Sequence, residues 1–288
     1  MCKCAQTIHI IYEWLYCHES YASTSHVLKT ESTILSMQPL KPVPQVAVVI
    51  PVYNENRFVV SLIHRIEAHL KPARYIVIDD ASSDDTRSLL DSLVPMLGDR
   101  LYVFSNKTNE GHGPTLIKGL TYALDHDVDA IMSLDGDGNF QIEDVKNLLD
   151  HFANSAADVA EGIRLNRKNP WFRVCGSAAT NFLVQLRSHK KVQDANTPYR
   201  IYSRDSLRDY LNRLPSKKIP TPNLYFSVFS RTKNHKISFV GIRTQTNNIE
   251  QPLGVSWNQR HQSIPSLRFI KFCLKSTYSW LIHKGDLL

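Results

Sequence analysis

Two aspartates separated by a single glycine, Asp135 and Asp137, directly follow an apolar run in "IMSLDGDGNF", residues 131–140. Carboxylates at this spacing can both reach one hard cation, and without a cation their repulsion would tend to keep one of them protonated. Mg²⁺ and Mn²⁺ accept such carboxylates together with phosphate oxygens of a substrate, and the carbonyl of Asn139 could add a third ligand. A plain surface turn is the alternative, because Asp and Gly are common turn residues.

Four polar clusters, each following a short apolar run, favour the metal interpretation. The runs are rich in β-branched or aromatic residues and too short for stable helices, so they are predicted to be strands. They are residues 46–50, 75–79, 100–104 and 129–134, followed by "PVYNEN", "DDASSDDT", "NKTNEGHG" and "DGDGN". Helical patterns at 57–70, 83–94 and 114–126 separate the runs, and the second is expected to begin on an N-cap Ser83. Alternating strands and helices predict a parallel sheet with helices on both faces, and the clusters then converge beyond the carboxyl ends of the strands.

Within these clusters, Asp79 and Asp80 could accept hydrogen bonds from a nucleobase or a ribose, whereas helix capping is the alternative role. Capping is the role that we expect of Asp84 and Asp85. The segment "NEGHGPTLIKG" fails the dinucleotide-binding and P-loop patterns, since Leu116 stands at the third glycine position and no Gly-Lys-Ser/Thr is present. We interpret it as a glycine-rich helix start that approaches a ligand.

The ordered motifs "VVIPVYNE", "IVIDDASSDDT", "NEGHG", "SLDGDGN", "AEGIR" and "DANTPYRIYSR" resemble the family-2 glycosyltransferases of the GT-A fold. The similarity is greatest to the branch with dolichyl-phosphate mannosyltransferases and bacterial polyprenyl-phosphate sugar transferases, and it extends from residue 46 to about residue 260. The resemblance implies an α/β fold with a mostly parallel sheet flanked by helices. It also implies a nucleotide-sugar donor, a UDP- or GDP-hexose, with divalent Mg²⁺ or Mn²⁺ and inversion at the anomeric carbon.

The same resemblance assigns roles to individual residues. The nucleoside pocket would be lined by Pro51, Tyr53, Asn54, Glu55, Asp79 and Asp80. Asp135 and Asp137 would hold metal and diphosphate, with Asn139 where many relatives have Gln. Arg164 would contact phosphate, and Asp194, Arg200 and Arg204 match the motif "D-x-x-S-G-F-R-x-Y-R-R". Thr197, Pro198 and Tyr199 replace its S-G-F, which leaves the acceptor-side loop open.

The catalytic set implied in this way is Asp137, Asp194 and Arg200. Arg164 or Arg200 would stabilise charge on the leaving diphosphate, as the metal would. Asp194 would be the base for a hydroxyl acceptor. A lipid phosphate is already ionised near neutral pH, so with that acceptor Asp194 would orient an arginine or the sugar instead.

The charge of the chain is distributed unevenly. Residues 1–160 hold 12 Lys and Arg against 21 Asp and Glu, a net charge of −9, whereas residues 161–288 hold 22 against 6, a net charge of +16. A basic half suits an anionic partner. Basic residues expected at an acceptor phosphate or at lipid headgroups are Arg164, Arg167, Lys168, Arg173, Arg187, Lys190 and Lys191. Nucleic acid is disfavoured, because no stacking module is recognisable and the acidic clusters would repel its phosphates.

Cysteine spacing and the lengths of the apolar runs indicate where in the cell the protein works. The five cysteines lack the regular spacing of a disulfide scaffold, which indicates a reducing, cytosolic setting. No apolar run reaches the roughly 18 residues of a membrane helix. Residues 265–284 could form an amphipathic helix in a bilayer interface, which would place the protein on the cytoplasmic membrane face, or a helix packed on the domain.

We therefore expect three segments: a poorly ordered extension at 1–45, a GT-A domain at 46–260 and an amphipathic helical segment at 261–288. A translation start at Met37 is the alternative explanation of the N-terminal segment. The leading functional hypothesis is an inverting, metal-dependent hexosyltransferase that acts on a polyprenyl phosphate, in peripheral contact with a membrane. Transfer to a saccharide or protein hydroxyl, and binding of a nucleotide sugar without catalysis, are the alternatives.

Overall fold

The computed structural model describes residues 44–165, 171–244 and 265–282. Residues 1–43 of the predicted N-terminal extension lie outside the described residues, as do Arg167 and Lys168. Within the described part, residues from Pro44 onward belong to one compact unit.

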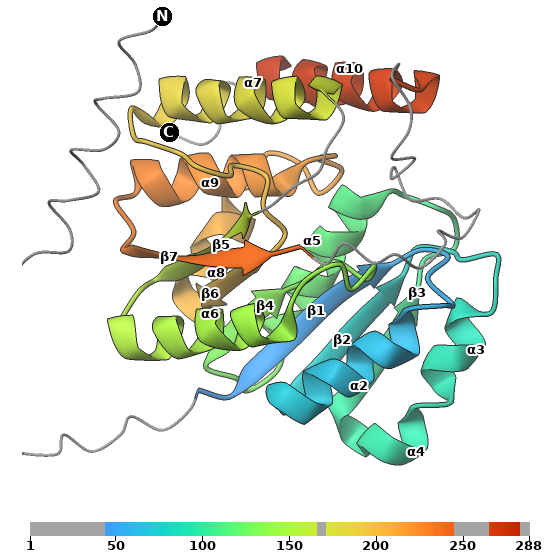
Figure 1. The fold of residues 1–288 in the computed structure, drawn as a ribbon. Coiled ribbons are helices and arrows are strands. Elements are labelled where there is room, and N and C mark those ends of the chain that lie inside the picture. Colours follow the sequence, from blue (N-terminus) through green and yellow to red (C-terminus); the bar gives the residue numbers. More distant parts are fainter. Residues whose placement is uncertain (1–43, 166–170, 245–264, 283–288) are drawn as a thin grey trace, which may run out of the picture. The chain divides into compact units, whose positions relative to one another are not determined.

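A mixed sheet of seven strands, in the order β3-β2-β1-β4-β6-β5-β7, forms the centre of this unit (Figure 1). The pairs β1–β2, β2–β3, β1–β4 and β5–β7 are parallel, whereas β6 is antiparallel to both β4 and β5. The strands are β1 (Val46–Val52), β2 (Arg74–Asp79), β3 (Leu101–Ser105), β4 (Ala130–Ser133), β5 (Val159–Leu165), β6 (Arg200–Ser203) and β7 (Ile237–Arg243). The predicted α/β class with a mostly parallel sheet is confirmed. All strands but β6 end at one edge, and β6 begins there.

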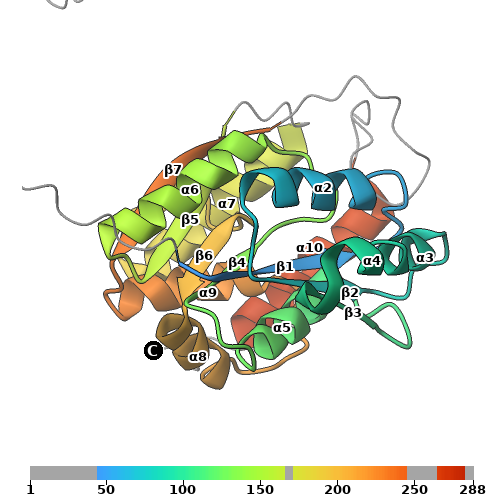
Figure 2. The same ribbon diagram turned by 90° about the horizontal axis from the view of Figure 1, so that it is seen from below.

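Side chains alternate along the strands, so the sheet buries two separate cores. In β1, Val48 and Ile50 pack against α2 (Val59–His69), α3 (Thr86–Asp91), α4 (Val94–Leu97) and α6 (Ile142–Ser155). Ala47 and Val49 face the opposite core with α5 (His112–Ala123), α8 (Arg204–Asn212) and α9 (Pro222–Thr232). Figure 2 shows the strands between these two helix layers.

The four predicted strands are present, but the helix predicted for residues 83–94 is divided. It begins at Thr86 instead of Ser83, ends at Asp91, and is followed by α4 and by the 3₁₀ turn η1 (Gly98–Arg100). Asp84 Oδ1 accepts a bond from Thr86 N at 3.0 Å, while the residue at the N-cap, Asp85, makes no side-chain cap. Pro95 has no backbone N–H, which fits the start of a new helix better than the interior of a continuous one.

Two further helices, α7 (Trp171–Ser188) and α10 (Leu267–Ile282), form an outer layer over α9 (Figure 1). Tyr225 Oη of α9 lies 3.0 Å from Ser279 Oγ of α10, and Trp280 packs edge-on against the Tyr225 ring. The Arg187 guanidinium of α7 lies 5.1 Å from the centre of the Trp280 ring, which joins the two outer helices. No helix in the described ranges has the length and apolar character needed to cross a bilayer.

Candidate active site

The turn that carries Asp135 and Asp137 follows β4 at the carboxyl edge of the sheet. Gly136 packs so closely on the end of β1 that a Cβ there would lie 2.9 Å from Pro51 O, and Gly138 has a positive φ of 60°. Both glycines are therefore required for the backbone path of this turn. Asp137 Oδ1 accepts a bond from Asn139 N at 3.0 Å. Burial, followed by the Asp135 charge, raises the pKa of Asp137 to about 6.

Three residues to which the motifs assign no role also surround this turn. Arg65 of α2 donates from Nη2 to Gly138 O at 2.8 Å. His112, the first residue of α5, has Nε2 at 3.8 Å from Asp135 Oδ1. The pKa of Tyr199 is held well above its ordinary value by burial and then by the charges of Asp135 and Asp137, so its phenol stays protonated near the pair. The sequence signal for His112 was its position in the glycine-rich helix start, whereas Arg65 lies in an ordinary helical pattern.

The loop after β1 brings a further carboxyl group to the pair. Burial, then Asp137, Asp135 and Asp84 in that order, raise the pKa of Glu55 to about 8. Its carboxyl is thus mostly protonated at neutral pH and can donate a hydrogen bond. Pro51 is buried near the end of β1, and Tyr53 lies half-buried just beyond it.

Asn54 joins this loop to the loop after β2. It adopts the left-handed conformation with φ at 55°, which asparagine tolerates better than most residues. Its Oδ1 accepts from Ser83 N at 2.8 Å, and its N donates to Ser82 Oγ at 2.9 Å.

Asp79 and Asp80 at the end of β2 have different surroundings, although both are buried. Asp79 accepts from Ser82 N at 3.0 Å and from Ser105 Oγ at 3.2 Å. The Asp80 carboxylate is more fully occupied, because its two oxygens accept from Glu110 N, Gly111 N and Asn106 Nδ2 at 2.7–2.9 Å. The structure thus gives Asp80 an internal role: it holds the loop that leads into α5.

Arg164 and Asp194 form a bidentate ion pair at the end of β5. Arg164 Nε and Nη2 each lie 2.7 Å from an oxygen of Asp194, and Arg164 Nη2 also donates to Asn196 O at 3.0 Å. The Asp194 side chain is only 9% exposed. Asp135 is among the charges that raise the pKa of Arg164, so the ion pair and the aspartate pair belong to one site.

Arg200 lies in the interior and not in the open part of the site, which corrects its predicted contact with a leaving group. Its side chain is fully buried, and Nη1 donates to Glu161 Oε1 at 2.7 Å. Arg231 of α9 binds the same carboxylate, with Nη2 at 2.8 Å from Oε2. Arg200 also donates to Thr197 O and Ala195 O at 3.2 and 3.0 Å. The side chain of Arg200 points inward from the first residue of β6, so the motif match located the residue but not its direction.

Asp135 and Asp137 fit a divalent cation. Desolvation of Asp137 and the neighbouring charge of Asp135 raise the pKa of Asp137, and a cation would relieve that repulsion. In the described part of the chain, no group of three or more His, Cys, Asp or Glu side chains is arranged around a common point. Two carboxylates together with oxygens from substrate or water are a common way of binding Mg²⁺.

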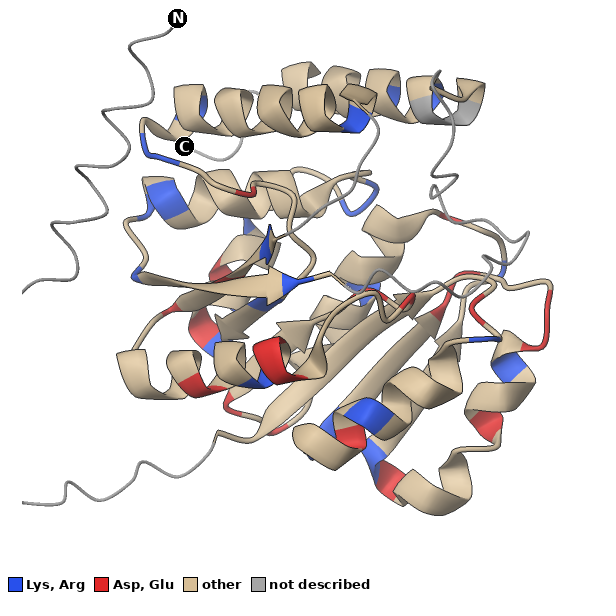
Figure 3. Cartoon of the chain, in the orientation of Figure 1, with Lys and Arg blue, Asp and Glu red and all other residues tan. Residues whose placement is uncertain are grey.

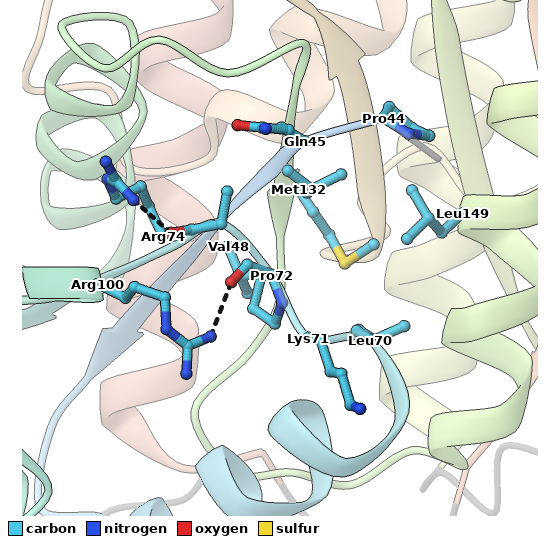
Figure 4. A pocket seen from close by; sticks show the side chains of 12 residues that line it. Pro44, Gln45, Val48, Leu70, Lys71, Pro72, Arg74, Arg100, Met132 and Leu149 are labelled. Atoms are coloured by element: carbon cyan, nitrogen blue, oxygen red, sulfur yellow. Dashed lines mark hydrogen bonds between the residues drawn. The ribbon is translucent and has the colours of Figure 1, made fainter. Parts of the chain in front are cut away.

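A cavity of about 530 Å³ lies at the opposite edge of the sheet, around the first residues of β1 and β2 (Figure 4). Val48, Met132 and Leu149 contribute apolar walls, and the guanidinium groups of Arg74 and Arg100 donate to the neighbouring carbonyls of Ala73 and Pro72. None of the predicted site residues lines it, so it is separate from the candidate active site.

Comparison with known families and proteins agrees with this geometry. Residues 47–211 match the model of the family described as Glycosyl transferase family 2. An undecaprenyl-phosphate 4-deoxy-4-formamido-L-arabinose transferase from Serratia proteamaculans is 29% identical over 180 residues, which are 61% of this chain and 54% of that protein. A polyprenol monophosphomannose synthase from Mycolicibacterium smegmatis is 28% identical over 173 residues, 58% of this chain and 65% of that protein. The chain thus spans less than two thirds of the length of either relative.

Solved structures share the fold. Glucosyl-3-phosphoglycerate synthase from Mycobacterium tuberculosis, in complex with Mn²⁺ and UDP-glucose, has a TM-score of 0.53 at 19% identity, with 74% of each chain covered. The mannosyltransferase PcManGT from Pyrobaculum calidifontis, in complex with GDP-mannose and Mn²⁺, has a TM-score of 0.51 at 14% identity, with 85% of this chain and 66% of that chain covered. At these identities the likeness concerns the fold, which is that of GT-A glycosyltransferases.

Proposed function

Because the chain belongs to glycosyl transferase family 2, we propose that it transfers a hexose, with inversion, from a nucleoside diphosphate sugar to a polyprenyl phosphate. The observation that carries this proposal is the meeting of the Asp135–Asp137 pair with the Arg164–Asp194 pair at the carboxyl edge of one sheet. The names of the two curated relatives, both sugar transferases or synthases of polyprenyl phosphates, support this acceptor class.

The donor is assigned to the acidic loops after β1, β2 and β4. Pro51, Tyr53, Asn54 and Glu55 would line the nucleoside pocket with Asp79. The protonated carboxyl of Glu55 suits an acceptor oxygen of a base or ribose. Asp135 and Asp137, with Asn139 as a further ligand, would hold Mg²⁺ or Mn²⁺ and the diphosphate; the Mn²⁺ complexes of the structural neighbours support this choice. When bound, the cation would neutralise charge that grows on the departing diphosphate.

The Arg164–Asp194 ion pair fits a phosphate acceptor better than a hydroxyl acceptor. A phosphate oxygen is already ionised, so its attack on the anomeric carbon requires no strong base while the bond to the diphosphate breaks. Both oxygens of Asp194 accept hydrogen bonds from Arg164, which makes Asp194 a group that orients the guanidinium. Arg164 would then face either the acceptor phosphate or the leaving group with a fixed charge.

The outer helices supply the proposed membrane contact. Along α7, Trp171, Val174, Phe182, Leu183 and Leu186 are exposed, and along α10, Leu267, Ile270, Leu274, Tyr278, Leu281 and Ile282 are exposed. Spacings of three and four residues place most of each set on one side of its helix. Neither helix contains Asp or Glu, and Figure 3 shows only basic charges on them. Exposed apolar stripes with basic residues and no acids favour the interface of an anionic bilayer.

This contact would make the protein peripheral on the cytoplasmic face, where a reducing environment keeps thiols such as Cys175 and Cys273 free. We name the α7 and α10 stripes together the outer apolar face. Trp280 of α10 is buried against α9, whereas Tyr278 is 68% exposed, so packing on the domain leaves the other side of this helix open for the proposed membrane contact.

The decisive experiment follows radiolabelled sugar from UDP- and GDP-hexoses, with Mn²⁺, into vesicles that contain a polyprenyl phosphate. We expect label in a product that organic solvent extracts and that mild acid hydrolyses. Label that appears only in water-soluble glycan would show a hydroxyl acceptor, and binding of donor without turnover on any acceptor would show a non-catalytic protein. Prior thermal-shift screening with the nucleotide sugars identifies the donor, because a ligand that binds the folded state raises the melting temperature.

A further inference from the structure

Asn181 connects the outer apolar face to the active site. It lies on α7, and its side-chain amide binds the loop before β6 at two points. Its Nδ2 donates to Gln193 O at 2.8 Å, and its Oδ1 accepts from Ala195 N at 2.9 Å. These two contacts bracket Asp194, which lies between them in the sequence.

The other side of the same loop is fixed to the core. Ala195 O accepts from Ser227 Oγ of α9 at 2.8 Å and from Arg200 Nη2 at 3.0 Å. The peptide groups on both sides of Ala195 are thus held, one by the outer helix and one by the interior.

Asp194 passes this constraint to the site, because both of its oxygens bind Arg164. A bidentate pair fixes direction as well as distance, so a shift of Asp194 rotates the guanidinium plane. One path from the apolar stripe to the arginine therefore runs through Asn181, the 193–195 backbone and Asp194.

We propose that Asn181 is a positioning residue through which the seating of α7 on a membrane sets the orientation of Arg164. The inference rests on the proposed function for its catalytic consequence, since it names the device by which lipid contact would act on the transfer site. Its structural part, the connection between α7 and Ala195, needs no catalytic activity and can be tested alone.

The first test measures transfer by full-length protein to a short prenyl phosphate that is soluble without detergent, with and without vesicles of phosphatidylcholine and phosphatidylglycerol. We expect vesicles to raise kcat of the wild type several-fold. In Asn181→Ala, vesicle binding should persist, but the stimulation by vesicles should be lost. The kcat measured with vesicles should fall on the order of tenfold, because a small displacement of a contact group has large kinetic effects. Gln185→Ala is the matched control, since Gln185 is exposed on the same helix one turn away and should keep the stimulation.

The proposal would be overturned if Asn181→Ala melts normally and vesicles still raise its kcat by the same factor as in the wild type. A loss of transfer in the same proportion with and without vesicles would also overturn it, because that result shows a purely local structural role.

The second test uses hydrogen exchange in the wild type and needs neither a variant nor turnover. Vesicles should slow exchange of the Ala195 amide, the donor to Asn181, relative to amides on the opposite face such as those of α2. Unchanged exchange of the Ala195 amide in vesicle-bound protein would contradict the connection. If the wild type transfers no sugar to any prenyl phosphate, the proposed function fails, and this exchange measurement still decides whether α7 and the loop are coupled.

Discussion

Asp137 occupies a position where its own charge is disfavoured, because burial and Asp135 both raise its pKa. Replacement by Asn removes that repulsion but also one of the two carboxylates that fit a cation. We expect Asp137→Asn to abolish sugar transfer and metal-dependent nucleotide binding while its melting temperature without metal stays equal to or above that of the wild type. Calorimetric titration with Mn²⁺ and nucleotide measures the binding.

Asp127→Asn is the control for this substitution, because Asp127 is exposed in the turn before β4. Metal-dependent binding that survives in Asp137→Asn would contradict the assignment of the site.

Glu161 is the counter-charge of two buried guanidinium groups and is itself 2% exposed. Removal of one partner from a buried charge network leaves uncompensated charge and typically costs about 3–5 kcal/mol. We therefore expect Glu161→Gln to lower the free energy of unfolding by an amount in that range, as measured by urea denaturation. Glu143→Gln, on the exposed side of α6, should change it little; comparable losses in the two variants would show that the buried network contributes nothing special.

For individual residues, the sequence predicts which residues form the site better than it predicts where their side chains point. Asp135, Asp137, Arg164 and Asp194 meet as the motifs indicate, because the turn after β4, the end of β5 and the loop before β6 lie at the same edge of the sheet. The inward direction of Arg200 depends on Glu161, which lies 39 positions earlier in the chain. The same carboxylate also binds Arg231, 70 positions after Glu161. One available signal is that Glu161 stands between the apolar residues Val159, Ala160 and Ile163, which is typical of a buried ion pair.

The contact between α5 and the segment before α9 depends on a glycine. A Cβ on Gly113 would lie 2.2 Å from Ile219 O and 2.6 Å from Pro220 O, and both atoms belong to backbone. Gly113→Ala should therefore destabilise the protein by about 1–3 kcal/mol, the usual cost of overpacking. Gly176→Ala on α7 is the control and should stabilise the protein. Nothing lies within 4 Å of its Cβ position, and helix propensity favours Ala by about 0.5–1 kcal/mol. Thermal melts of both variants should shift in opposite directions, and a shift of the same sign would refute the packing argument.

Glu67 joins α2 to β2 and to the turn before β3. Its oxygens bind Arg100 Nη2 at 2.8 Å and Tyr75 Oη at 2.7 Å, and the Arg100 bond is the main cause of a pKa below the ordinary 4.5. A depressed pKa contributes stability above the ordinary value, and this contribution is lost as pH falls through the folded-state pKa. Glu67→Gln should thus cost about 1 kcal/mol near pH 7 and progressively less in acid. Urea denaturation over this pH range tests it, and a difference between the two proteins that does not change with pH would argue against the ion pair.

At the scale of elements, periodicity predicts the first four strands and the helices α2 and α5 well. It does not predict the order of β5, β6 and β7, because strand pairing there is set by contacts distant in sequence, with β5 placed between β6 and β7. The division of the predicted 83–94 helix follows from Pro95 and from the Asp84 bond to Thr86, which compete with a helix begun at Ser83.

For the whole molecule, the uneven charge of the sequence and the outer apolar face make one prediction together. Leu186→Glu and Leu274→Glu place acids on residues that are 60% and 66% exposed, one on each outer helix. Both substitutions should reduce the fraction of protein that sediments with anionic vesicles, because an acid removes apolar contact and adds repulsion from the headgroups. Met96→Glu is the control, since Met96 is also exposed but lies on α4 over the opposite core. Equal loss in all three variants would indicate a general charge effect instead of a specific face.

The reversed direction of β6 has a consequence for how such a chain can diversify. The chain leaves the sheet after Leu165 at the end of β5, forms the outer helix α7, and returns as β6, whose first residue Arg200 pairs with Glu161 of β5. Everything between Leu165 and Arg200 is an excursion whose ends are fixed by neighbouring strands, so it can change length or sequence without altering strand register. The donor-side loops precede it in the chain. Because the excursion carries Asn181 and Asp194, recombination confined to it would exchange the residues that hold Arg164 while the loops after β1, β2 and β4 are inherited unchanged.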